Sequence, residues 1–153
     1  MNITLINPPH TAIGSRIPRE HLPPLGLLSV GGPLIDAGFQ VDLIDAELAP
    51  MSLAQIALEV QRRKPDVVMI GHSGSSTAHP TVVQLSRQLK VALPKLTIVY
   101  GGVHPTYHWD EILGECADID IIVRGEGEQT ALDLMLAIAA KASIFLMSSR
   151  ISA

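Results

Sequence analysis

The chain has 153 residues, of which 47% are hydrophobic but only 3% aromatic, and its formal net charge at pH 7 is −4. This length suffices for one domain with an aliphatic core, and the acidic balance without a basic run argues against nucleic acid as a partner. The single cysteine, Cys116, excludes an internal disulfide and a cysteine-clustered metal site. No apolar run reaches membrane-spanning length and no signal peptide is evident, so we expect a cytoplasmic protein without a membrane span.

Apolar runs and amphipathic stretches alternate along the first half of the chain. The sequence predicts strands at residues 3–7, 39–45 and 67–71. It predicts helices from Leu25 to about Ile35 and from Leu53 to about Lys64. The third strand is apolar throughout, which is typical of a parallel sheet covered by helices on both faces.

The same alternation continues in the second half. We expect strands at 96–100 and 119–123, and helices at about 82–92, 107–116 and 129–140. In the helix at 107–116, the side chains expected to face inward are Trp109, Ile112, Leu113 and Cys116. Five strands joined by right-handed crossovers predict an α/β, doubly wound, flavodoxin-like parallel sheet in three layers, with strand order 2-1-3-4-5.

Residues 141–153 do not continue this pattern. The segment around Ile144, Phe145 and Leu146 has neither the helical nor the strand period of the preceding elements. We therefore expect a domain at 1–140 and a tail, or the stub of a linker, at 141–153.

The loops that follow the strands are the candidate binding surface, because ligands of open α/β sheets bind at the carboxyl ends of the strands. Gly101 and Gly102 end the fourth strand and remove side chains where a backbone must come close to another group. The loop after the third strand contains Ser73, Gly74, Ser75 and Ser76. Its hydroxyls and amides suit a phosphate or a polar tail, although a serine-rich turn that caps a helix is the simpler interpretation of any one serine.

Several nucleotide-binding classes are not supported. The chain has no Gly-x-Gly-x-x-Gly after the first strand and no Gly-Lys-Ser or Gly-Lys-Thr. A response-regulator receiver would need an aspartate after the third strand and a lysine after the fifth, where this chain has Gly71-His72 and Val123-Arg124. Pro8-Pro9 stands where a flavodoxin would place its phosphate loop.

The histidines differ in their expected roles as ligands or contacts. His10 follows the first strand and is either a metal ligand or a solvated loop residue, and His104 is the best candidate for a polar contact. The other histidines are expected to cap or contact a ligand (His72, His79) or to lie on the surface (His21, His108).

The segment Arg124-Gly125-Glu126-Gly127-Glu128 stands at the start of the last predicted helix. Acidic residues in a first turn complement the helix dipole, which is a sufficient structural explanation for the two glutamates. Two glycines separated by one residue go beyond capping and indicate that a ligand or another domain lies against this turn.

Four motifs together resemble a known family. They are Asn7-Pro8-Pro9, Pro23-Pro24-Leu25-Gly26-Leu27-Leu28, Gly101-Gly102-Val103-His104-Pro105 and Val123-Arg124-Gly125-Glu126-Gly127-Glu128. Asp45 and Pro65-Asp66-Val67-Val68 also fit. Over residues 1–140 the chain resembles the N-terminal cobalamin-binding domain of radical-SAM enzymes, a group that includes the oxygen-independent magnesium-protoporphyrin IX monomethyl ester cyclase and related methyltransferases.

The resemblance implies that cobalamin lies across the carboxyl edge of the sheet, with its nucleotide tail between the loops after strands three and four. It implies that Ser73, Gly74, Ser75 and Ser76 line the tail and that Gly101 and Gly102 let it pass close to the backbone. The remaining implied contacts are Pro9, His10, Val103, His104, Gly125, Glu126 and Gly127.

The chain departs from related patterns in two places. Methionine-synthase-like domains have Asp-x-His-x-x-Gly after strand one, whereas here Pro8 replaces the aspartate and Gly14 comes one position late, so His10 as a cobalt ligand would lack a carboxylate partner. Base-off binding without a histidine is the alternative in this family. The Cys-x-x-x-Cys-x-x-Cys of a radical-SAM cluster is absent, so S-adenosylmethionine and the iron–sulfur cluster would belong to a separate catalytic domain, in cis or in trans.

The resemblance thus implies a cobalamin-binding module of a radical-SAM methyltransferase or cyclase, without a complete active site of its own. Two alternatives remain open. One is a flavodoxin-like binding domain for another polar ligand, such as a nucleotide sugar. The other is a structural domain that docks to a partner.

Overall fold

A computed structural model of the chain describes residues 1–9, 23–72 and 76–151, without the side chains of residues 77 and 143–151. It contains one parallel sheet with strand order β2-β1-β3-β4-β5, as the sequence predicts. The strands are β1 (Asn2–Asn7), β2 (Gln40–Asp45), β3 (Val67–Gly71), β4 (Thr97–Gly101) and β5 (Ile121–Val123).

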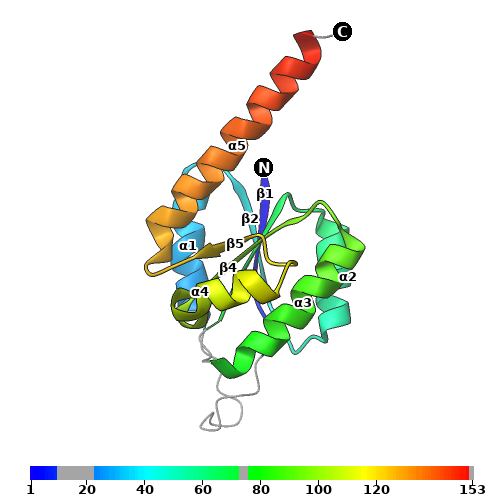
Figure 1. Cartoon of the computed structure of the whole chain (residues 1–153), viewed down its shortest axis with the longest axis vertical. Coiled ribbons are helices and arrows are strands. Elements are labelled where there is room, and N and C mark those ends of the chain that lie inside the picture. Colours follow the sequence, from blue (N-terminus) through cyan, green and yellow to red (C-terminus); the bar gives the residue numbers. More distant parts are fainter. Residues whose placement is uncertain (10–22, 73–75, 152–153) are drawn as a thin grey trace.

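Helices cover both faces of the sheet (Figure 1). They are α1 (Leu25–Asp36), α2 (Leu53–Arg63), α3 (His79–Ala92), α4 (Val103–Glu115) and α5 (Gly127–Ile151), with a 3-10 turn, η1 (Ser76–Ala78), before α3. The buried side chains of α1 and α5 belong to one apolar cluster and those of α2, α3 and α4 to another. The predicted three-layer, doubly wound architecture is confirmed.

Successive strand residues enter opposite layers of the core, because side chains alternate across a sheet. Ile6, Ile70 and Tyr100 pack with α2, α3 and α4. Their immediate neighbours Leu5, Met69 and Val99 pack with α1 and α5 instead. This alternation continues to the carboxyl ends of the strands, where it determines what each layer presents there.

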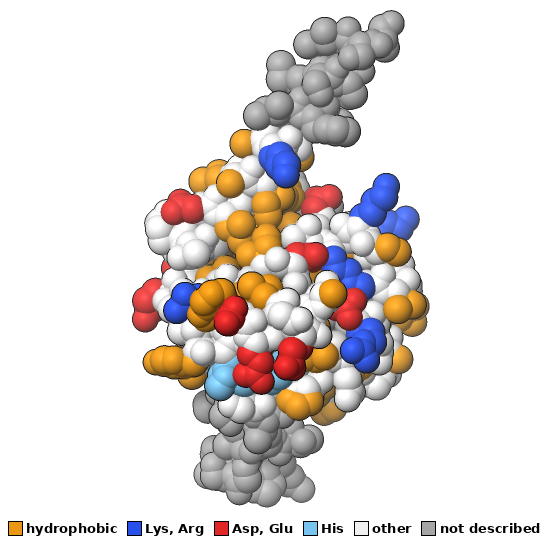
Figure 2. Space-filling model, in the orientation of Figure 1, with side chains coloured by type: hydrophobic (Ala, Val, Ile, Leu, Met, Phe, Trp, Pro, Cys, Tyr) orange, Lys and Arg blue, Asp and Glu red, His pale blue; other side chains and the backbone are white. Residues whose placement is uncertain are grey.

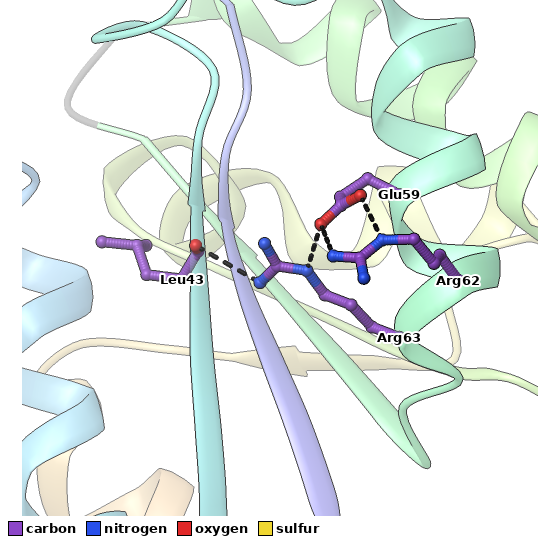
Figure 3. Close-up of polar contacts among 4 residues, drawn as sticks. All are labelled: Leu43, Glu59, Arg62 and Arg63. Carbon is purple, nitrogen blue, oxygen red and sulfur yellow. Dashed lines mark hydrogen bonds and ion pairs between the residues drawn. The ribbon is translucent and has the colours of Figure 1, made fainter.

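The edge strand β2 is tied to the end of α2 by charged groups (Figure 3). The Glu59 carboxylate accepts hydrogen bonds from Arg62 at 2.7 and 2.9 Å and from Arg63 at 2.8 Å. The Arg63 guanidinium also donates to the Leu43 carbonyl oxygen at 3.4 Å. These bonds to the arginines lower the pKa of Glu59 from 4.5 to about 2.

Helix α4 begins four residues earlier than the sequence predicts. Gly102 is its N-cap, so Val103, His104 and Pro105 form the first turn rather than a loop. A proline fits there because the first helical amides have no carbonyl partner within the helix. Of the side chains expected to face inward, Ile112 and Cys116 are buried, whereas Trp109 and Leu113 are 39% and 42% exposed, so the prediction is wrong for these two.

Helix α5 is longer than predicted at both ends. It begins at Gly127 and continues to Ile151, past residue 140, where the predicted helix ends. The domain boundary at residue 140 stays a prediction. Alanine and leucine are the most frequent residues over α5 as a whole, and their helix propensities favour a helix without an amphipathic period. The helix projects beyond the sheet (Figure 1). No helix in the described part of the chain is both long and apolar enough to cross a bilayer.

Candidate functional site

The carboxyl edge of the sheet presents different groups to its two layers. Gly71 and Gly101 are paired in register at the ends of β3 and β4, in the alternating positions that face α1 and α5. Tyr100, one residue before Gly101, packs in the opposite layer, where the buried His72 ring contacts it. The edge therefore has a bare side toward α1 and α5 and an aromatic side toward α3 and α4.

Aliphatic side chains border the bare side. A Cβ at Gly71 would lie 3.0 Å from Leu27 Cδ2, and one at Gly101 would lie 3.8 Å from Val123 Cβ. Where α5 begins, a Cβ at Gly127 would lie 3.2 Å from Val30 Cγ2 of α1. Gly71 is itself buried under Leu27, so a group that reaches this side would meet the peptide backbone at the half-buried Gly101, between apolar walls. This combination suits a flat or chain-like organic ligand.

The glycines at this edge have different structural reasons for lacking a side chain. Gly102 has a φ of 115° and Gly125 a φ of 68°, conformations that residues with a Cβ rarely adopt. Gly101 has a φ outside this region, and a Cβ there would meet its neighbours at 3.7 and 3.8 Å, which is ordinary van der Waals contact. The described fold would therefore accept a side chain at Gly101, although glycine weakens a strand. The missing side chain at Gly101 points to a ligand rather than to packing.

Thr106 connects the two positive-φ turns at Gly102 and Gly125. Its hydroxyl donates to the Gly102 carbonyl at 2.7 Å and accepts from the Gly125 amide at 3.0 Å. The Arg124 Nε donates to the Thr106 carbonyl at 3.3 Å, and its guanidinium lies 5.1 Å from the centre of the Trp109 ring. Thr106 was not among the site residues predicted from the sequence. The signal that points to it is a threonine four residues after a glycine cap, from which a hydroxyl reaches the preceding turn.

On the aromatic side, a phenol and an imidazole are joined in the interior. Tyr100 is fully buried, and its hydroxyl lies 2.9 Å from Nε2 of His72. Burial raises the pKa of Tyr100, so it remains a neutral phenol. The His72 carbonyl lies 3.4 Å from the position of a Cβ on Gly102, which places the chain after β3 directly against the turn after β4.

Three imidazoles form a row next to Tyr100. The His79 and His104 rings are 4.5 Å apart, as are those of His104 and His108, and Nδ1 of His104 lies 3.0 Å from the Ser76 hydroxyl. Histidine side chains gather at one edge of the visible face, beside acidic groups (Figure 2). Burial lowers the pKa of His79 and of His104, so both are neutral at pH 7. Within the described ranges, no group of three acidic, histidine or cysteine side chains is arranged to hold a metal ion.

Asn7, from the Asn7-Pro8-Pro9 motif, contacts Asp45, which also belongs to the pattern of the family. The Asn7 side-chain amide, at the end of β1, donates to the Asp45 carboxylate at the end of β2 at 2.9 Å. The same carboxylate oxygen accepts from the amides of Glu47 and Leu48 at 3.1 and 3.2 Å. Asn7 and Asp45, 38 residues apart in the sequence, thereby fix the turn at this corner of the edge.

The structure brings some of the predicted site residues together. Ser76, Gly101, Gly102 and His104 lie around the ends of β3 and β4, and Gly125 joins them through Thr106. Glu126 and Val103 are exposed near the same edge, and Gly127 begins α5. His10, Ser73, Gly74 and Ser75 lie outside the described residues, and Pro9 is the last described residue before that gap. Their contacts with a cofactor stay predictions, as does the role of His10 as a cobalt ligand.

Comparison with known families assigns the domain. A family model described as the B12 binding domain matches residues 18–135. The chain belongs to the B12-binding domain family. The fold agrees, since the structure of OxsB, a cobalamin-dependent S-adenosylmethionine radical enzyme with aqua-cobalamin and S-adenosylmethionine bound, superposes with a TM-score of 0.74 at 18% identity. That match covers 91% of this chain and 19% of OxsB.

Curated relatives of this B12-binding domain are much longer proteins. The anaerobic magnesium-protoporphyrin IX monomethyl ester cyclase of Synechocystis is 56% identical over 138 residues, which cover 90% of this chain and 28% of the cyclase. The cyclase of Rubrivivax gelatinosus is 32% identical, with coverage of 90% and 24%. The hopanoid C-3 methylase of Methylococcus capsulatus is 30% identical, with coverage of 80% and 24%. The chain thus spans between a fifth and a third of the length of these relatives, and the expected relationship to radical-SAM cyclases is confirmed.

Proposed function

We propose that this B12-binding domain holds cobalamin across the carboxyl edge of its sheet, with the nucleotide tail on the bare side at Gly101. The main support comes from Gly101, because neither the backbone conformation nor the contacts of an added Cβ in the described fold require a glycine there. Aliphatic neighbours such as Leu27 and Val123 suit the apolar parts of a nucleotide base. The residues present therefore fit this cofactor.

We further propose that the cofactor binds base-off, with its own lower base withdrawn from cobalt into the tail pocket. In support, the sequence lacks the Asp-x-His-x-x-Gly pattern in which a carboxylate orients a ligating histidine. The cofactor would supply the cobalt chemistry. The protein would supply the bare backbone edge and the two fixed glycine turns that position it.

The larger assembly is proposed to be a cobalamin-dependent radical-SAM enzyme of the cyclase type, acting in the cytoplasm. The 56% identity to the Synechocystis cyclase supports this assignment over a methyltransferase, because the hopanoid C-3 methylase is only 30% identical. S-adenosylmethionine and an iron–sulfur cluster would be held by a further catalytic domain, in cis or in trans. This chain cannot hold such a cluster, because it has one cysteine.

The test is retention of hydroxocobalamin, read from the visible spectrum after incubation and desalting. We expect the parent chain to retain the corrin, and a Gly101→Val variant to bind it at least about tenfold more weakly while keeping the parent's circular dichroism. Gly114→Val is the matched control, because a Cβ at Gly114 would meet nothing within 4 Å on the exposed side of α4. The corrin band position distinguishes base-on from base-off binding.

Each outcome has a defined meaning. A parent chain that retains no corrin contradicts cobalamin binding by the chain and favours another polar ligand, for which nucleotide sugars are the first candidates. Equal retention by the parent and Gly101→Val would leave cobalamin binding intact but refute the placement of the tail at Gly101.

A further inference from the structure

Two turns that border the carboxyl edge lie at the ends of different strands. Gly102 follows β4, and Gly125 follows β5. Both glycines have positive φ. Glycine adopts positive and negative φ about equally readily, so the local sequence alone does not fix either turn in this conformation. Glycine residues lose more conformational freedom on ordering than other residues, so a separate contact is needed to hold two such turns in one arrangement.

The Thr106 hydroxyl is the side-chain group that makes this contact. It donates to the carbonyl of Gly102 and accepts from the amide of Gly125, at 2.7 and 3.0 Å. The Gly102 carbonyl also accepts from the Thr106 amide at 3.2 Å, which fixes the donor's own position in the first turns of α4. A hydroxyl donates and accepts through one atom, and at this short distance from the backbone a threonine or serine hydroxyl can join a carbonyl to an amide in this way.

We propose that Thr106 is a positioning residue that sets the spacing of the Gly102 and Gly125 turns before the ligand arrives. This inference rests on the proposed function, because the ligand it serves is the corrin cofactor. A preformed pair of turns lowers the ordering cost of binding, so loss of the bridge weakens affinity without removing any contact to the cofactor. Arg124, which donates to the Thr106 carbonyl, holds the same bridge from the β5 side.

The experiment compares Thr106→Val, which keeps the shape of threonine but neither donates nor accepts, with Thr106→Ser, which restores the hydroxyl. We expect Thr106→Val to bind hydroxocobalamin about tenfold more weakly than the parent, and Thr106→Ser to lie within about threefold of it. Thr97→Val is the matched control, since it makes the same chemical change at the opposite, amino-terminal end of β4.

A second readout does not involve the cofactor. Hydrogen exchange of the Gly125 amide in the cofactor-free protein should be faster in Thr106→Val than in the parent, and slow again in Thr106→Ser, because this amide donates to the hydroxyl. The thermal midpoint reports general destabilisation. We expect the midpoints of Thr106→Val and Thr97→Val to lie within a few degrees of each other.

The proposal is overturned if Thr106→Val binds the corrin as tightly as the parent, or if Thr106→Ser binds as weakly as Thr106→Val. Failure of the parent to bind any corrin would instead count against the proposed function. In that outcome the exchange rate of the Gly125 amide still decides whether Thr106 joins the two turns.

Discussion

Substitution of Gly102 by alanine tests how much of the site geometry depends on one backbone conformation. The φ of 115° and ψ of −170° at this N-cap lie in a region that is essentially restricted to glycine. Holding another residue there costs about 1–3 kcal/mol, whereas the 3.4 Å distance from the new Cβ to the His72 carbonyl oxygen is an ordinary contact. We therefore expect Gly102→Ala to lower the free energy of unfolding by about 2 kcal/mol.

A second glycine in the same helix gives the matched control. Gly114 lies within α4 with nothing within 4 Å of an added Cβ, so Gly114→Ala should raise stability by about 0.5–1 kcal/mol through helix propensity. The assay is urea unfolding of the cofactor-free chain, followed by circular dichroism. The reasoning is refuted if Gly102→Ala unfolds within about 0.5 kcal/mol of the parent, because that would mean the turn relaxes to an ordinary conformation at little cost.

Three further predictions concern polar groups. Tyr100→Phe should lower the free energy of unfolding by about 1 kcal/mol, measured by urea unfolding, because the buried hydroxyl contacts His72; an unchanged midpoint would contradict this. Burial lowers the pKa of His79, so the unfolded chain binds a proton at this residue at higher pH than the folded chain does. The thermal midpoint should therefore fall as the pH drops from about 7 to 5, and His79→Gln should reduce this dependence. An equal pH dependence in the parent and the variant would contradict a lowered pKa at His79. Glu59→Gln should lower the thermal midpoint slightly at pH 7. The difference from the parent should shrink as the pH falls from 4.5 toward about 2, because the Glu59 carboxylate is then protonated and its bond to Arg63 weakens. A difference that persists at pH 2 would argue against the ion pair.

The sheet could be predicted because its information is local. Runs such as Val67–Gly71 are apolar on both faces, and their order along the chain with right-handed crossovers leaves few topologies. The start of α4 could not, because His104-Pro105 has the composition of a loop, and only the cap at Gly102 shows that the proline occupies a first helical turn.

The candidate site was predicted where it depends on glycine and missed where it depends on spacing in three dimensions. Gly101 and Gly102 are recognisable because adjacent glycines at a strand end are unusual. Thr106 is one of several threonines, and nothing in its sequence neighbourhood shows that its hydroxyl meets Gly125, nineteen residues away. His108 was predicted to lie at the surface and is exposed there. Its ring also stacks on that of His104, although the backbone at His108 is not helical.

Because side chains alternate across the sheet, two adjacent residues at the end of β4 belong to different layers. Tyr100 belongs to the layer of α3 and α4, whereas Gly101 belongs to the bare side toward α1. Point substitutions can therefore alter one layer and leave the other as it was, so that the imidazole row and the glycine surface are free to diverge separately. Loss or gain of a single residue in this strand would exchange the two, placing a phenol where bare backbone stands and a glycine in the core. A change in strand length would therefore disturb both layers at once, whereas a substitution at either residue disturbs one.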